Sequence, residues 1–343
     1  MSRNRKLSKQ QGFFYCIGVF CALLLPLANK HLSQGKFGYM TRFLFSIILL
    51  LWSYHSQANT DTIILKNHLK NITKTPAYRN HQNLTQLNAI ADYIKTDFLK
   101  YSDSVSFQEY EVDGKMYKNV ICSFGTANQQ RIIVGAHYDV CGNQEGADDN
   151  ASGVVGLLEL ARQLKEKKLN KRIDLVAYTL EEPPYFRTEH MGSYVHAKYL
   201  AEHQTNVFGM LSVEMIGYFK DEKKSQEYPL GILSWFYGSK GNYITLVNKF
   251  SKGKFARQFS NNFKKTRTIS TKKFTGPKAL PGIDFSDHLN YWNFGYSALM
   301  ITDTSFYRNK NYHKKTDKLE TLDINRMAKV IDGIYLTLLA LSN

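Results

Sequence analysis

The stretch that decides the fold is RIIVGAHYDVCGNQEGADDNASGVVGLLELARQL, residues 131–164. An apolar, strand-like run opens it and delivers His137 and Asp139. After a loop, Asp148 and Asp149 stand at the start of a stretch with helical character. Adjacent carboxylates repel each other unless a cation or a helix N-terminus absorbs their charge. The stretch therefore predicts a strand, an acidic loop that meets a cation or a helix end, and a helix.

Strands and helices alternate along the rest of the chain, which predicts an α/β protein. We expect a three-layer α/β/α sandwich with a mixed, mostly parallel central sheet. We interpret residues 59–82 as a polar lead and residues 251–280 as a surface insertion. Strands are predicted at 104–112, 118–124, 131–136, 173–180, 207–213 and 296–301, and helices at 84–101, 151–167, 192–201 and 324–341.

Residues 1–58 contain two apolar runs, 13–28 and 43–52, and no acidic residue. The second run follows Arg42 and precedes a Ser-Gln-Ala triplet that ends at Ala58, which is the pattern of a secretory signal. Its length of about ten residues is too short to span a bilayer.

We therefore predict that translation starts at Met40 and that cleavage follows Ala58. The product, residues 59–343, would be a single domain exported to the periplasm or secreted, with only transient membrane contact through its export signal. The alternative is a membrane anchor formed by residues 13–28.

The chain is basic, with a formal net charge of +16. Residues 1–58 hold seven of the 45 Lys and Arg residues and none of the 29 acidic residues. Residues 59–343 therefore carry 38 basic and 29 acidic residues, a net charge of +9. Ten of these cations lie in 249–278, which has no acid. We interpret this segment as a solvated basic loop or a contact with an anionic cell envelope, and we predict no nucleic-acid partner.

Five candidate metal ligands follow predicted strands or stand at a helix start, and the carboxyl ends of strands form the ligand crevice of open α/β sheets. Imidazole and carboxylate ligands suit zinc, and a pair of zinc ions needs one bridging carboxylate. Three carboxylates and a hydroxide would also neutralise two Zn²⁺. We expect one metal at His137 and Glu214, the other at Glu182 and His313, and Asp149 between them.

Glu181 is left over beside a ligand, which is the position of a general base. Asp139 is placed to accept the second imidazole N–H of His137, and we expect the same of Asp317 toward His313. Further residues expected to support the site are Asp148, Ser286 and Asp287.

The motifs AHYD, GADDNASG, EEPP…MGS, VEMIGY, SDH and YHKKTD occur in this order. From about Leu84 to the C-terminus the chain thereby resembles the di-zinc aminopeptidases, whose clan also contains glutamate carboxypeptidases and glutaminyl cyclases. The resemblance implies a single zinc-peptidase catalytic domain over 59–343 with two Zn²⁺ per chain. It implies the same ligands, with the second Asp of "ADD" as the bridge, and Glu181 as the base. The implied reaction is hydrolysis that removes the N-terminal residue of a peptide, with a water held between the metals as the attacking group.

The sequence departs from that family in two places. Glu214 replaces the more usual Asp, and the loop after Glu182 is long. Candidates for substrate contact are Tyr185, Phe186, Arg187 and Tyr312.

Other activities of the same fold stay open. A glutaminyl cyclase would use one zinc, although such relatives favour Trp where this chain has Tyr312. A carboxypeptidase remains a further alternative. A non-catalytic binding domain is disfavoured because all five ligands are present.

Overall fold

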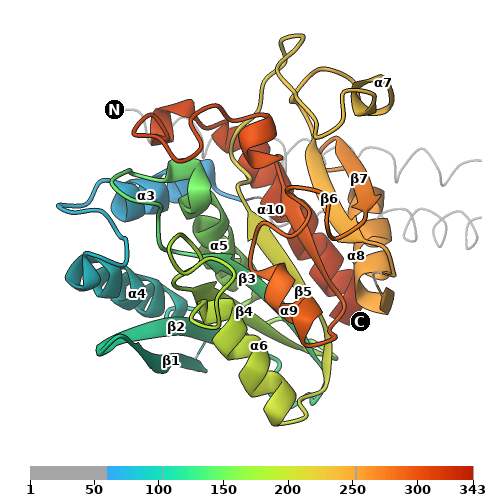
Figure 1. Cartoon of the computed structure of the whole chain (residues 1–343). Coiled ribbons are helices and arrows are strands. Elements are labelled where there is room, and N and C mark those ends of the chain that lie inside the picture. Colours follow the sequence, from blue (N-terminus) through green and yellow to red (C-terminus); the bar gives the residue numbers. More distant parts are fainter. Residues whose placement is uncertain (1–59, 103, 252, 343) are drawn as a thin grey trace, which may run out of the picture. The chain divides into compact units, whose positions relative to one another are not determined.

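The computed structural model describes residues 60–102, 104–251 and 253–342 (Figure 1). Residues 59–343 form one compact unit. The predictions made for residues 1–58 lie outside the described part of the chain. Within that part, no helix combines the length and the apolar character needed to cross a membrane.

One eight-stranded sheet runs through the unit in the order β1-β2-β4-β3-β5-β8-β6-β7. The four central strands β4, β3, β5 and β8 are parallel, as are β6 and β7. Three neighbouring pairs are antiparallel, namely β1 with β2, β2 with β4, and β6 with β8. The strand bounds are β1 Val105–Val112, β2 Lys115–Phe124, β3 Arg131–His137, β4 Arg172–Tyr178, β5 Val207–Glu214, β6 Ile244–Lys249, β7 Thr271–Gly276 and β8 Ala298–Thr302.

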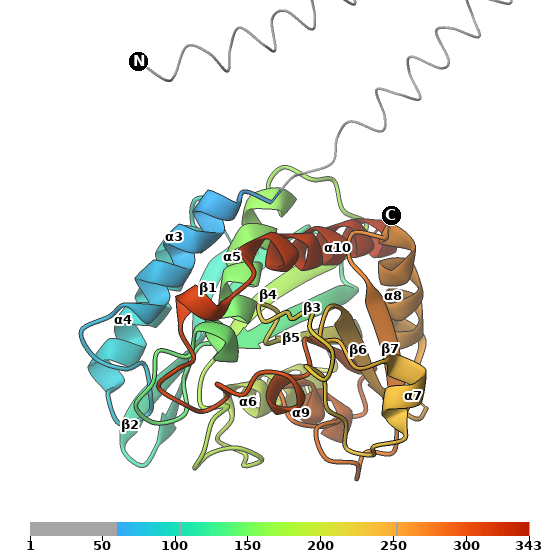
Figure 2. The same ribbon diagram turned by 90° about the horizontal axis from the view of Figure 1, so that it is seen from above.

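Helices cover both faces of the sheet, which Figure 2 shows from above. The layer on one side consists of α3 (Thr62–Thr73), α4 (Leu84–Phe98), α5 (Gly153–Leu164), α8 (Gly253–Thr266) and α10 (Ile324–Ser342). The layer on the other side consists of α6 (Gly192–Glu202) and α9 (His288–Asn293). The short helix α7 (Leu233–Tyr237) lies beside the β6–β7 edge. The predicted three-layer sandwich with a mixed, mostly parallel sheet is confirmed.

Two glycines shape the strand and loop that begin the site. A Cβ at Gly135 would lie 2.2 Å from the ring of Tyr178 on the neighbouring strand β4, so only glycine lets β3 and that ring pack together. Gly146 has a φ of +56°, and a Cβ there would lie 2.3 Å from the carbonyl oxygen of Asp149. The acidic turn therefore depends on glycine directly before it.

The interpretation of residues 59–82 as a polar lead was wrong, because α3 occupies residues 62–73. The side chain of Asp61 caps this helix by accepting hydrogen bonds from the backbone N–H groups of Ile63 and Ile64. Its apolar face is buried through Leu65, Leu69 and Ile72.

The interpretation of residues 251–280 as a surface insertion, and of residues 249–278 as a solvated basic loop, was also wrong. The segment forms α8 and the edge strand β7, which are integral to the sandwich. Phe255, Phe259 and Phe263 recur every four residues and are buried, so α8 packs against β5 and α10 despite its many cations.

Candidate metal centre

Five side chains converge at the carboxyl ends of the central strands. The Nε2 atom of His137 lies 3.4 Å from Oδ1 of Asp149 and 3.5 Å from Oε2 of Glu214. The Nε2 atom of His313 lies 3.2 Å from the other oxygen of Asp149 and 3.1 Å from Oε2 of Glu182. Asp149 thus presents one oxygen to each histidine, as a carboxylate shared by two cations would.

The parallel strands explain this meeting. His137 ends β3 and Glu214 ends β5, while Glu182 follows β4, the other neighbour of β3. The side chains of these residues are buried, whereas His313, on the loop after β8, is 27% exposed. The cluster is therefore closed on the sheet side and accessible from the side of His313.

The electrostatics of this cluster fit a site for cations. Burial raises the pKa of Glu181 well above its ordinary value, and burial together with Asp149 raises the pKa of Glu182 to about 7. Among the described residues, Glu182 Oε1 has no hydrogen-bond partner, and Asp149 Oδ2 and His313 Nε2 lie 3.2 Å apart without a well-aligned hydrogen bond. Buried carboxylates that face one another need a counter-charge, and the donor set of imidazole and carboxylate suits zinc.

Asp139 supports the two glutamates more directly than it supports the histidine. Its carboxylate oxygens accept hydrogen bonds from the backbone N–H groups of Glu181 at 3.2 Å and Glu182 at 3.1 Å. Its distance to His137 Nδ1 is 3.5 Å, at the limit for a hydrogen bond. Asp139 therefore fixes the backbone that presents both glutamates.

The prediction that Asp317 accepts a hydrogen bond from the imidazole N–H of His313 was wrong. Its carboxylate accepts hydrogen bonds from the backbone N–H groups of Asp148 at 3.0 Å and Asp149 at 3.0 Å. Two converging backbone donors at the start of a turn bind a carboxylate better than a side chain four residues away does. Asp317 consequently anchors the acidic turn.

Asp148 points away from the histidines and ties the turn to two other loops. Its carboxylate accepts hydrogen bonds from the Gly217 N–H at 2.9 Å and from Asn309 Nδ2 at 2.7 Å. Its neighbour Asp149 faces the metal site, so the two adjacent acids have different surroundings.

Glu214 is held by two side chains. Ser286 donates its hydroxyl to Glu214 Oε2 at 2.7 Å, and Asn150 Nδ2 lies 3.3 Å from the same oxygen. Asn150 also accepts the N–H of Met215 at 3.1 Å, so it holds the chain next to Glu214. Asp287 is fully buried, and burial raises its pKa to about 7. Sequence reasoning missed Asn150, although it directly follows the two acids.

Arg79 is the second residue that sequence reasoning missed, because nothing near it in the chain marks it as functional. It lies between α3 and α4, is 2% exposed, and reaches the segment between His137 and Asp149. It donates to the carbonyl oxygens of Tyr138 at 2.8 Å and Gly146 at 2.7 Å, and also to that of Glu145.

Cys141 lies next to two of the candidate metal ligands, Glu182 and His313. Its Sγ is within 4.8 Å of ligand atoms of Glu182 and His313. Cys141 and Cys122 are both free thiols in the structure. The thiol is therefore a further ligand candidate for a soft cation.

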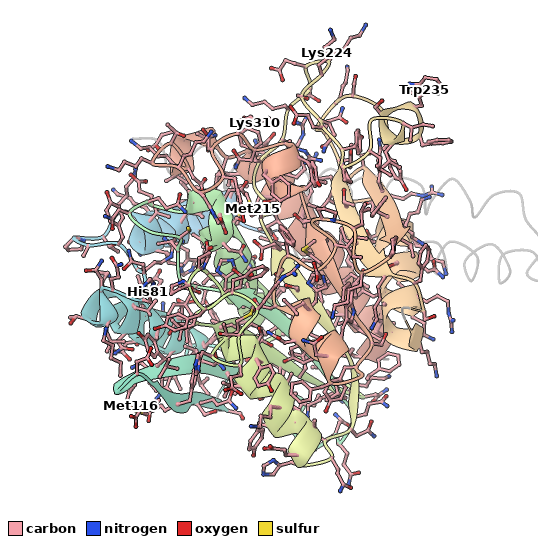
Figure 3. The ribbon with its side chains drawn as sticks, viewed as in Figure 1. His81, Met116, Met215, Lys224, Trp235 and Lys310 are labelled. Carbon is pink, nitrogen blue, oxygen red and sulfur yellow. The ribbon has the colours of Figure 1, made fainter. Side chains whose placement is uncertain are left out.

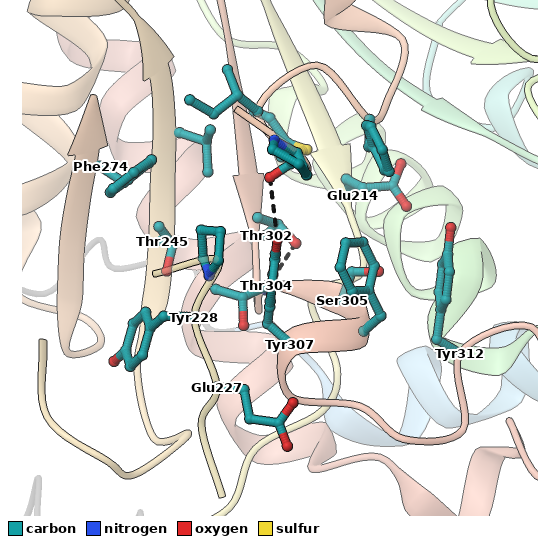
Figure 4. A pocket seen from close by; sticks show the side chains of 18 of the residues that line it. Glu214, Glu227, Tyr228, Thr245, Phe274, Thr302, Thr304, Ser305, Tyr307 and Tyr312 are labelled. Atoms are coloured by element: carbon teal, nitrogen blue, oxygen red, sulfur yellow. Dashed lines mark hydrogen bonds between the residues drawn. The ribbon is translucent and has the colours of Figure 1, made fainter. Parts of the chain in front are cut away.

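A cavity of about 210 Å³ opens from the carboxylates toward β6, β7 and β8. In Figure 4, Glu214 and Tyr312 stand at one side of it, and Phe274 and Tyr228 stand at the other. Tyr312 stacks on the ring of His313, with centroids 3.8 Å apart. The pocket therefore joins a charged end to an aromatic and apolar wall.

Of the four predicted substrate contacts, Phe186 and Tyr312 line this pocket, while Tyr185 and Arg187 do not. The hydroxyl of Tyr185 donates instead to Asp113 at 3.3 Å, and the guanidinium of Arg187 binds Asp284 at 2.6 Å. The prediction for these two residues is corrected accordingly, because their polar groups are engaged elsewhere.

Comparison with known proteins places the chain in a family. The sequence pattern described as "Peptidase family M28" matches residues 119–338. The uncharacterized protein YfbL of Escherichia coli (strain K12) is 42% identical over 278 residues, which cover 79% of this chain and 85% of that protein. A probable leucine aminopeptidase of Arthroderma otae is 29% identical over 230 residues, but the match spans only 55% of its length.

Solved structures share the fold at low sequence identity. LapB from Legionella pneumophila aligns with a TM-score of 0.65 at 20% identity, covering 82% of this chain and 72% of that one. A glutaminyl cyclase from Bacteroides thetaiotaomicron aligns with a TM-score of 0.62 at 17% identity, covering 82% of this chain and 99% of that one. The resemblance drawn from the motifs is thereby confirmed. Because the family pattern covers more than half of the sequence and the same region carries the converging acids and histidines, the chain belongs to peptidase family M28.

Proposed function

We propose that the chain is an exported, zinc-dependent aminopeptidase that removes apolar N-terminal residues from peptides. The observation that carries this proposal is the position of Asp149, which lies between His137 and His313 at the inner end of an apolar pocket. One carboxylate shared by two ligand groups favours a site for two cations.

The residues present fit two zinc ions. Asp149 would be shared, with His137 and Glu214 on one side and with Glu182 and His313 on the other. When bound, the cations would polarise the scissile carbonyl and make a water molecule more acidic.

Glu181 is the residue we assign as general base. It is buried at the inner end of the pocket, its Oε2 lies 3.9 Å from His137 Nε2, and Asp139 fixes its backbone. It would take a proton from the attacking water and return it to the leaving amine. That role leaves the neighbouring Glu182 free to act as a ligand.

The pocket favours a free amino terminus over a free carboxyl terminus. None of the described residues that line it is Lys or Arg. A carboxypeptidase needs such a cation to bind the terminal carboxylate of its substrate. Val247, Phe274 and Met300 form part of the wall and suit an apolar side chain.

Metal content and activity, measured on purified residues 59–343, test the proposal. We expect two zinc ions per chain by elemental analysis and hydrolysis of Leu- and Phe-anilides, but not of their N-acetylated forms. Glu181→Gln should keep the metal and lose about 10²- to 10⁴-fold in kcat. Glu189→Gln, an exposed residue on the same loop, is the matched control and should behave as wild type.

Two outcomes would overturn parts of the proposal. One zinc per chain with cyclisation of an N-terminal Gln and no hydrolysis would make the protein a cyclase and remove the shared role of Asp149. N-terminal sequencing of the protein from its source tests export, since a chain that begins at Asn59 supports cleavage and a retained 13–28 segment contradicts it.

A further inference from the structure

A cluster of large apolar side chains is exposed around α7. Trp235 is 84% exposed, Phe236 77%, Ile232 58% and Leu230 53%, all within seven residues. Figure 3 shows Trp235 projecting from the body of the domain. Soluble proteins scatter single exposed apolar residues, whereas a contiguous group marks a contact surface.

A basic surface lies on α8. Burial of its phenylalanine face turns the cations outward, and Lys254, Arg257, Lys264 and Lys265 are exposed along the helix. Among the described residues these four cations make no ion pair with an acid, since residues 249–278 contain none and no salt bridge reaches these side chains from elsewhere.

The apolar cluster and the basic helix belong to one continuous face at the β7 edge of the sheet. Tyr237 of α7 donates its hydroxyl to the carbonyl oxygen of Lys273 on β7 at 3.0 Å. Lys273 in turn donates its Nζ to Asn261 Oδ1 on α8 at 2.6 Å. Figures 1 and 2 both place α7 and α8 at this edge. We call the surface formed by α7, β7 and α8 the edge face.

We propose that the edge face docks on an anionic lipid surface, with Trp235 and Phe236 entering the interfacial layer. Aromatic side chains partition into the boundary between headgroups and acyl chains, and lysines and arginines beside them are attracted to anionic headgroups. The net charge of +9 on residues 59–343 adds to this attraction. The positive charge of the edge face therefore favours an anionic lipid surface as its partner.

A second copy of the chain fits the edge face poorly. A two-fold contact would bring the same patch of both copies together, so the cations of one α8 would meet those of the other. A nucleic acid would satisfy the cations but would leave Ile232 and Leu230 without an apolar partner. A lipid surface satisfies both features.

The edge face adjoins the pocket, because Leu233 and Tyr237 of α7 line that cavity. Trp235 and Phe236 lie on the same short helix without lining it. Docking would therefore present the pocket next to the membrane surface. The inference itself does not depend on which reaction the site catalyses.

The two tryptophans of residues 59–343 make the test selective. Trp292 is 5% exposed and donates its indole N–H to Ala298 O at 2.9 Å, so only Trp235 can change its surroundings on docking. Residues 59–343 contain the whole sheet and its core, and they exclude the apolar runs that would enter lipid themselves. We would add vesicles of 1:1 phosphatidylglycerol and phosphatidylcholine, or of phosphatidylcholine alone, at low salt.

We expect a blue shift of tryptophan emission and co-sedimentation with the anionic vesicles only, both reversed by salt. Lys264→Gln/Lys265→Gln should weaken binding by about fivefold per cation removed. Trp235→Ala/Phe236→Ala should weaken it at least about tenfold and keep activity on soluble anilides. The matched controls are Lys66→Gln/Lys70→Gln on α3 and Leu99→Ala after α4, which lie away from the edge face and should bind as wild type.

Three results would overturn the proposal. The first is no binding to anionic vesicles at low salt by protein with a native circular dichroism spectrum. The second is binding with unchanged tryptophan emission and an unaffected Trp235→Ala/Phe236→Ala variant. The third is a dimer in sedimentation velocity that this variant dissociates, which would assign the edge face to a second copy instead.

Discussion

Replacing Arg79 by Met should loosen the segment between His137 and Asp149 and thereby weaken metal binding. The guanidinium is 2% exposed and donates to the carbonyl oxygens of Tyr138, Glu145 and Gly146. These acceptors lie at the two ends of the connecting loop. One side chain therefore sets how far apart His137 on β3 and Asp149 in the acidic turn are held.

The expected cost follows from those contacts. Three hydrogen bonds to buried acceptors, at roughly 1–1.5 kcal/mol each, amount to about 4 kcal/mol of unfolding free energy. Burial lowers the pKa of Arg79 only to about 10, so the group is a cation at pH 7 and also favours the charged forms of Asp317 and Asp149. Outer partners of metal ligands typically control affinity by about 10- to 100-fold, and we expect zinc affinity to fall by that factor.

Urea unfolding of the metal-free protein and zinc titration against a competing chelator measure the two effects separately. Arg131→Met is the matched control: the Arg131 side chain is 20% exposed and donates to Asp174 Oδ2 at 3.0 Å, at the start of β3 and so at the opposite end of that strand from His137. It should destabilise the fold without changing zinc affinity. Wild-type zinc affinity in Arg79→Met, or an equal loss in Arg131→Met, would refute the reasoning.

Removing the metal with a chelator at pH 7 should lower Tm, because the buried carboxylates then face one another without a counter-charge. Zinc at about 1,000 times its Kd should restore about 4 kcal/mol of unfolding free energy, which calorimetry would measure. His196 is buried, and burial lowers its pKa from 6.5 to about 4. Between pH 6.5 and pH 4 the imidazole is therefore protonated in the unfolded chain but not in the folded protein, so the stability of the fold falls as the pH drops. Between pH 7 and pH 5 this group should cost about 2 kcal/mol, and His196→Gln should lose that part of the pH dependence of urea unfolding. Phe274→Ala should lower kcat/KM for Leu-anilide by about 10- to 150-fold and change Ala-anilide less, as steady-state assays on both substrates would show.

The central part of the fold could be predicted because its signals are local. The apolar run before His137, the helix after Asp149 and the strands at 104–112 and 118–124 each follow from periodicity, and the structure has β3, α5 and the β1–β2 hairpin there. The convergence of His137 and Glu214 needed only the rule that parallel strands end at one edge of a sheet.

The errors at 59–82 and 251–280 came from weighing composition above periodicity. Asp61 with Leu65 and Leu69 formed a capped amphipathic pattern, and Phe255 and Phe259 began a second one. High polarity and charge in both segments hid these patterns. A buried face needs only one apolar residue per turn, so a basic segment can still be a packed helix.

Arg79 could not have been predicted by any local rule. Its partners are backbone carbonyl oxygens more than fifty residues away in the chain, and a carbonyl has no side-chain identity that a sequence can show. Only the packing of the α3–α4 connection against the acidic turn creates the site for a guanidinium. Such contacts belong to tertiary structure alone.

Asp317 shows a second limit of sequence-based prediction, because a clear sequence signal predicted the wrong hydrogen-bond donors for it. Its spacing from His313 was a valid signal, but spacing alone does not show which of several possible donors a carboxylate meets. The N–H groups of Asp148 and Asp149 point at Asp317 from the start of the acidic turn. These hydrogen bonds also hold the backbone of Asp149 in place. The proposed metal site therefore depends on acids of two kinds: those that would face the cations, such as Asp149, and those that keep the backbone of the first kind in place, such as Asp317 and Asp139.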